Sequence, residues 1–120
     1  MYYNNLVLFE KIYEFSLWIY PCVNKFPKSQ RFVLGQHIEN TVLELLEGVI
    51  EANSARSKQY HWKRISLKLD KLRVLIRFAK DMKFINIRQY EFASVQVNEV
   101  GKILGGLMKT DKTNHFFFSP

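Results

Sequence analysis

The residue types most often used for metal binding and nucleophilic catalysis are scarce in this chain, which has three histidines and one cysteine. His37, His61 and His115 show no metal-ligand spacing with one another or with Cys22, so no metal site is expected. Cys22 lies near the end of an aromatic-rich segment, where a cysteine usually packs as a small hydrophobic side chain. A lone cysteine forms no intrachain disulfide. The sequence predicts neither a catalytic residue nor a cofactor.

One loose catalytic pattern does occur. Some four-helix-bundle ribonucleases of the HEPN type use an arginine and a histidine separated by four to six residues. Arg31 and His37 have five residues between them, and Arg56 and His61 have four. About half a match of this kind is expected by chance, because the spacing is permissive. Polar residues that this family places after its arginine are replaced here by Phe32–Val33, so a ribonuclease stays only as an alternative to a non-enzymatic protein.

Positive charge is concentrated in one segment. The chain has 18 lysines and arginines against 11 acidic residues, for a net charge of +7. Ten of those basic residues, but only two aspartates, lie between Arg56 and Lys83, which leaves the rest of the chain near neutral. This concentration favours an acidic partner such as nucleic acid over charge that only keeps the protein soluble.

The basic residues of this segment follow a helical period. At 100° per residue, they flank an apolar core stripe on both sides. One flank holds Arg64, Lys68 and Lys71, and the other holds Arg73, Arg77 and Lys80. A second apolar stripe, nearly opposite the core, consists of Tyr60, Leu67, Val74 and Phe78.

A second apolar stripe indicates an interface between subunits or with a partner, although scattered exposed apolar residues are normal on monomers. Association of identical subunits through it would bring several basic rows together and strengthen the binding of a polyanion. Tyr60 and Trp62 could stack on unpaired bases, as aromatic residues do in single-strand binding proteins, although such residues more often pack at helix ends.

Four helices must position these residues. Apolar residues recur at helical spacing over residues 6–24, 29–54, 57–83 and 87–109, and residues 111–120 read as a loose tail. Gly35 and Gly48 inside the second segment are expected to permit close helix crossings. Asn86 and Gln89 form a capping-box pattern that begins the fourth helix. The sequence therefore predicts a single all-α domain, an antiparallel up-down-up-down four-helix bundle.

The same composition bears on location. The longest charge-free stretch before the tail, Phe15 to Asn24, is about half of the ~20 apolar residues that a membrane span needs. The first residues lack the basic start of a secretory signal, and a single cysteine gives no sign of an oxidising compartment. We expect a soluble, cytoplasmic protein with no membrane partner.

Several segments resemble one family closely. Residues 17–36 (LWIYPCVNKFPKSQRFVLGQ), 69–80 (LDKLRVLIRFAK), 89–93 (QYEFA) and 100–106 (VGKILGG) are similar to accessory variability determinant (Avd) proteins of diversity-generating retroelements. The resemblance covers all four predicted helices in order. A broader related set is the four-helix-bundle proteins encoded in intervening sequences of 23S ribosomal RNA.

This resemblance implies a pentameric, barrel-shaped assembly of four-helix bundles with a positive surface. Such proteins associate with the reverse transcriptase of the element and with RNA or DNA, and support mutagenic cDNA synthesis and retrohoming while the polymerase chemistry belongs to the partner. The implied binding surface comprises the two basic flanks, with Lys25, Lys28 and Arg31 as secondary candidates. Leu107 and His37 depart from the family pattern, which usually has Trp and Arg there. A general RNA-binding bundle of the intervening-sequence type is the alternative.

Overall fold

The chain is entirely helical in the computed structural model, which describes the backbone of residues 2–118 and the side chains of residues 2–110. Its elements are α1 (Tyr3–Asn24), α2 (Lys28–Gln30), the π-helical turn η1 (Arg31–Gly35), α3 (Gln36–Ser54), α4 (Gln59–Asp81) and α5 (Ile87–Phe118). No strand occurs among the described residues, and the predicted all-α class is confirmed. The fourth helix was predicted to end at residue 109, but α5 continues to Phe118, so the backbone of residues 111–118 is helical and not a loose tail. The side chains of residues 111–120 lie outside the described residues.

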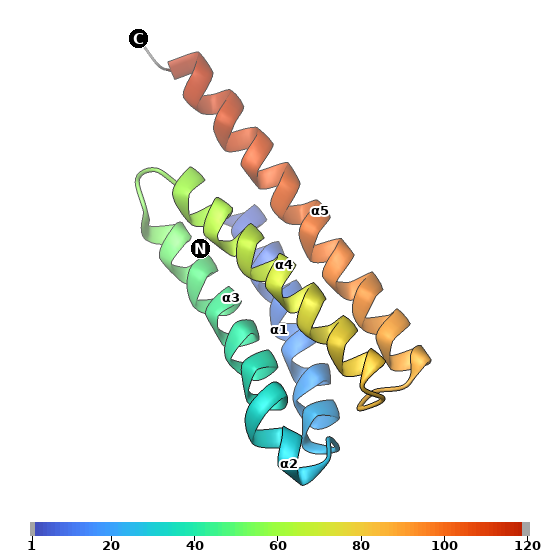
Figure 1. Cartoon of the computed structure of the whole chain (residues 1–120). Helices are drawn as coiled ribbons and strands as arrows, with labels where there is room; N and C mark the ends of the chain where they lie inside the picture. The colour runs from blue at the N-terminus through green and yellow to red at the C-terminus, as the bar shows by residue number, and fades with distance from the viewer. Residues whose placement is uncertain (1, 119–120) are drawn as a thin grey trace.

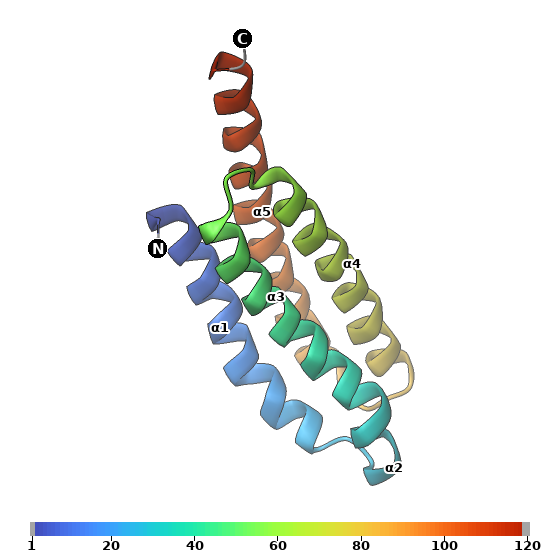
Figure 2. The same cartoon turned by 90° about the vertical axis from the view of Figure 1, so that its left-hand side faces the viewer.

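The four long helices pack as an up-down-up-down bundle (Figure 1). α3 packs against α1 and α4, and α5 packs against α4 and α1. The rotated view shows α1, α3 and α4 in succession, with α5 behind α3 (Figure 2). α1 and α4 are therefore diagonally opposite, so their outer sides face away from each other.

The core consists of the predicted apolar stripes. One residue from each long helix illustrates the pattern: Ile12, Val42, Leu72 and Val97 are all at most 2% exposed. Ile50 of α3 is apolar but 51% exposed, because it lies about 100° around the helix from Val49, which is fully buried. Trp62, for which the sequence left both base stacking and packing open, is fully buried and belongs to the core.

Two glycines permit close packing, as predicted. A Cβ atom on Gly48 would lie 2.9 Å from Cγ1 of Ile65, so the absence of a side chain lets α3 approach α4. A Cβ atom on Gly35 would lie 2.6 Å from Cγ1 of Val23. Gly35 ends the π-helical turn, and the helix predicted over residues 29–54 is divided there into α2, η1 and α3.

The connection between α4 and α5 is closed by local hydrogen bonds. Lys83 adopts a left-handed conformation with φ 65°, and the Phe84 amide donates to the Ala79 carbonyl at 2.9 Å, which ends α4 in a Schellman-type turn. The Asn86 amide donates to the Gln89 side chain and the Gln89 amide donates to the Asn86 side chain, both at 2.8 Å. The predicted capping box is confirmed.

Candidate nucleic-acid interface

The second apolar stripe of α4 points away from the core. Tyr60, Leu67, Val74 and Phe78 are between 51% and 67% exposed. We call these four residues the α4 stripe. On the opposite side of the same helix, Ile65 and Leu72 are each 1% exposed. The predicted two-sided character of this helix is therefore confirmed, and a single copy of the chain leaves the α4 stripe facing solvent.

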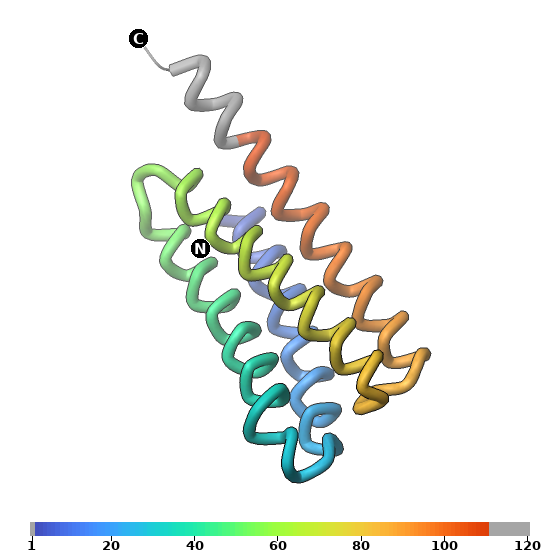
Figure 3. The backbone as a smooth tube through the Cα atoms, viewed as in Figure 1, coloured from blue at the N-terminus to red at the C-terminus, as the bar shows by residue number. Residues whose placement is uncertain are grey.

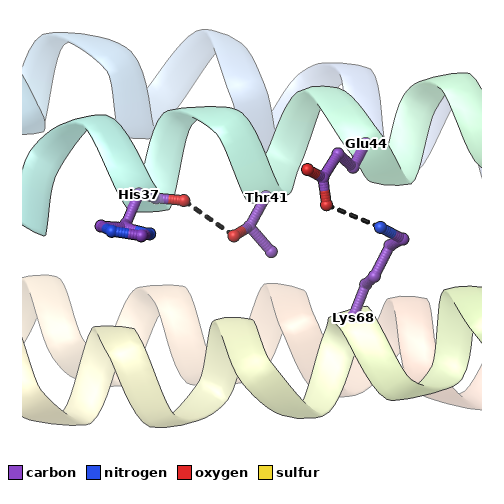
Figure 4. Close-up of polar contacts among 4 residues, drawn as sticks. All are labelled: His37, Thr41, Glu44 and Lys68. Atoms are coloured by element: carbon purple, nitrogen blue, oxygen red, sulfur yellow. Dashed lines mark hydrogen bonds and ion pairs between the residues drawn. The ribbon is translucent and has the colours of Figure 1, made fainter.

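The basic row beside α3 is partly neutralised within the molecule. Lys68 Nζ lies 2.6 Å from Glu44 Oε2 of α3 (Figure 4). The Arg64 guanidinium lies over the ring of Tyr60, 5.7 Å from its centre, so it covers one end of the α4 stripe. Lys71 is exposed and forms no ion pair with any described residue. Within this row, Arg64 and Lys71 are therefore more available to a binding partner than Lys68.

The basic row beside α5 also has acidic neighbours, both of them on α4. Arg73 Nη1 lies 2.7 Å from Asp70 Oδ1, whereas Asp81 lies 3.8 Å from Arg77 and 3.3 Å from Lys80. Exposed pairs of this kind contribute at most about 1 kcal/mol. A phosphate group can therefore replace the aspartates at little cost.

The secondary candidates lie at one end of the bundle. The connections α1–α3 and α4–α5 meet there (Figure 3), where the rings of Phe26 and Phe84 pack 5.6 Å apart. Lys25 and Lys28 are exposed, but Arg31 is half-buried. Its Nε is buried without a hydrogen-bond partner in the described structure, so Arg31 is less accessible than the sequence suggested.

Two basic residues at this end were missed from the sequence. Lys83 and Arg88 are exposed and border the second connection, and neither forms an ion pair with a described residue. The up-down order of the helices contained the necessary signal, because it places the first and third connections at the same end. The number of charges per segment of sequence does not reveal that these basic residues lie at the same end of the bundle, since Lys25 and Lys83 are far apart in the chain.

The candidate catalytic pairs are not joined in the described structure. No hydrogen bond links Arg31 to His37 or Arg56 to His61, and the His37 carbonyl accepts a bond from the Thr41 hydroxyl within α3 at 2.7 Å. The Tyr60 ring instead makes an edge contact with His61. No group of three metal-ligating side chains occurs within the described residues.

Cys22 is half-buried, and the Gln89 side-chain amide donates to its sulfur at 3.9 Å. Burial raises the pKa of the Cys22 thiol, although nearby Lys25 lowers it to a smaller extent. The thiol therefore stays protonated near neutral pH and is a poor nucleophile.

Comparison with known proteins assigns this four-helix bundle to a family. Residues 6–110 match the sequence model of the bAvd-like family. The chain belongs to the bAvd-like family. No curated protein matches it in sequence.

The fold of this bAvd-like protein is also found in a solved structure. It is similar to a crystal structure of a protein with unknown function from the S23 ribosomal protein family of Bacteroides thetaiotaomicron, with a TM-score of 0.80. The two share 19% identity over 88% of this chain and 98% of the other. This likeness supports the four-helix-bundle fold. Within the described residues, no helix is long and apolar enough to cross a membrane.

Proposed function

We propose that this bAvd-like protein is a non-catalytic accessory protein of a diversity-generating retroelement. It binds the reverse transcriptase of the element and nucleic acid, and supports mutagenic cDNA synthesis and retrohoming in the cytoplasm. The observation that carries the proposal is the exposed α4 stripe between two basic rows in a chain of this family.

Self-association is part of the proposal. Burying the α4 stripe between copies removes apolar side chains from water, and a homopentamer, as the family resemblance implies, carries five copies of each basic row in one assembly. Multiplying the cations along one surface increases the affinity for a polyanion, because binding releases counterions from every neutralised phosphate and links several weak contacts.

A charge reversal on the row beside α5 tests nucleic-acid binding. Arg77→Glu is expected to weaken binding and to reduce the slope of log affinity against log salt by about 1, the contribution of one phosphate contact. Lys102→Glu is the matched control, because Lys102 is an exposed cation on α5 and its reversal changes the net charge equally. Equal losses in the two variants would show that net charge, rather than this row, determines binding.

Co-purification tests the partner. The protein is expected to co-purify with the reverse transcriptase encoded beside it, and Arg73→Glu combined with Lys80→Glu is expected to reduce that association. RNA binding without any association with the polymerase would contradict the accessory role and favour a general RNA-binding protein of the intervening-sequence type. Cleavage of RNA that is lost in His37→Ala or His61→Ala would instead favour the ribonuclease alternative.

A further inference from the structure

A second exposed apolar surface lies on the other side of the molecule. Leu6, Tyr13 and Leu17 of α1 and Leu43 and Ile50 of α3 are between 41% and 62% exposed. We call these five residues the α1–α3 face. Leu6, Tyr13 and Leu17 recur at helical spacing on a side of α1 that is separate from its core residues. The residues of the α4 stripe are arranged in the same way on α4.

The structure places these residues along one shared edge. The Tyr20 hydroxyl of α1 donates to the Glu39 carbonyl of α3 at 3.3 Å, so this side of α1 borders α3. Tyr13 and Leu17 lie seven and three residues before Tyr20, and Leu43 lies four residues after Glu39. Residues at these spacings occupy the same side of a helix. The two helices therefore form one apolar surface.

Carboxylates border the α1–α3 face. Glu10 and Glu14 are interleaved with its residues on α1. Glu47 lies between Leu43 and Ile50 on α3, on the rim that also borders the groove toward Arg64 and Lys68 of α4. All three are exposed, and none forms an ion pair with a described residue. α3 contains no lysine or arginine, and Lys11, the one basic residue of α1, pairs with Glu99 of α5. This face is acidic and apolar.

The α4 stripe has the opposite charge around it. Seven lysines and arginines lie on α4 against two aspartates. Two α4 stripes in contact would place cations against cations, whereas an α4 stripe against an α1–α3 face would place cations against carboxylates. The electrostatics therefore favour the second pairing.

We infer that the α4 stripe of one copy docks on the α1–α3 face of a second copy. This inference rests on the self-association proposed above and adds to it the surface that covers the α4 stripe. α4 lies diagonally opposite α1, so one molecule presents both surfaces in different directions. A head-to-tail contact leaves one unused surface at each end of a growing chain of copies. The chain closes into a ring when the rotation per copy completes one turn in a whole number of copies, as a pentamer requires.

The test uses two variants that each disable one surface. The stripe variant carries Leu67→Gln and Phe78→Gln, and the face variant carries Leu17→Lys and Ile50→Lys. Each alone is expected to have the mass of one chain by multi-angle light scattering. An equimolar mixture is expected to form a dimer with one chain of each kind, because the stripe variant keeps an α1–α3 face and the face variant keeps an α4 stripe.

Several results separate this inference from the proposed function. A face variant that assembles like the unmodified protein, or a mixture that stays at the mass of one chain, would overturn the head-to-tail contact while leaving self-association in place. An unmodified protein with the mass of one chain would overturn self-association itself.

Two controls address folding and charge. Val95→Lys alters an exposed apolar residue on α5 outside both surfaces, and it is expected to assemble normally. Circular dichroism is expected to show unchanged helicity in every variant. Leu17→Lys alone, at a side chain that is 62% exposed, supplies a milder change and is expected to weaken assembly.

Discussion

The two sides of α4 are both apolar at helical spacing, yet they have different surroundings. Leu69 and Leu72 on the inner side are at most 2% exposed, whereas Leu67 and Val74 on the outer side are more than half exposed. The difference shows that an apolar period predicts a surface that will be covered, but does not reveal what covers it. For the inner side the cover is the same chain, and for the outer side we propose another copy.

The largest expected effect comes from truncating the inner side. Leu72→Ala is expected to lower the free energy of unfolding by about 2–5 kcal/mol, because it removes buried methyl groups and leaves a cavity. Thermal unfolding should show a lower Tm at every protein concentration.

Leu67→Ala makes the same chemical change on the outer side. Self-association stabilises the folded chain by mass action, so the unmodified protein is expected to unfold at a Tm that rises with protein concentration. Leu67→Ala should weaken that dependence while changing the Tm little at high dilution. If Leu67→Ala and Leu72→Ala lowered the stability equally at high dilution, the outer side of α4 would contribute to the single chain as much as the inner side does, which would contradict this account.

A smaller effect is expected where α3 approaches the inner edge of α4. Gly48→Ala would place a Cβ atom 2.9 Å from Ile65 Cγ1. Overpacking costs about 1–3 kcal/mol, and about 1 kcal/mol of helix propensity offsets part of this. We expect a net loss of stability in chemical denaturation.

Gly105→Ala is the control for that experiment, because no described atom outside its own turn of helix lies within 4 Å of the added Cβ atom. It should stabilise the protein by up to about 1 kcal/mol through helix propensity alone. If Gly48→Ala stabilised the protein equally, the close contact between α3 and α4 would not exist.

The smallest expected effect on stability comes from the outer rim of α4. Glu44→Gln removes the carboxylate that pairs with Lys68 and should change the free energy of unfolding by less than about 1 kcal/mol, because the pair is exposed. Nucleic-acid binding is expected to become tighter and more sensitive to salt, since Lys68 becomes available to phosphate. Glu91→Gln on α5 changes the net charge equally and should have less effect on both.

Much of the fold could be predicted because its determinants are local. Core residues such as Ile12 and Val97 follow a single period, and the Asn86–Gln89 capping box needs only four residues. Contacts between distant segments could not be predicted in the same way. The Lys58 ammonium donates to the Ala52 and Ala55 carbonyls at 3.0 and 2.9 Å, so it caps α3 although it was counted only as part of the basic segment.

The candidate site shows the same limit. The exposure of Leu67 and Val74 followed from their place on the helix, whereas the Lys68–Glu44 pair depends on how α3 is rotated against α4. The role of Trp62 stayed open for a related reason. An aromatic residue near the start of a basic helix is compatible with either stacking on bases or packing in the core, and the neighbouring helices decide between them.

The central claim is that another copy of the chain covers the outer side of α4. Sedimentation velocity of the unmodified protein tests it most directly, because it measures the mass in solution without any substitution. The account predicts a single species with five times the 14.3 kDa of one chain. A species with the mass of one chain at all concentrations would contradict it, and would leave the α4 stripe without a partner.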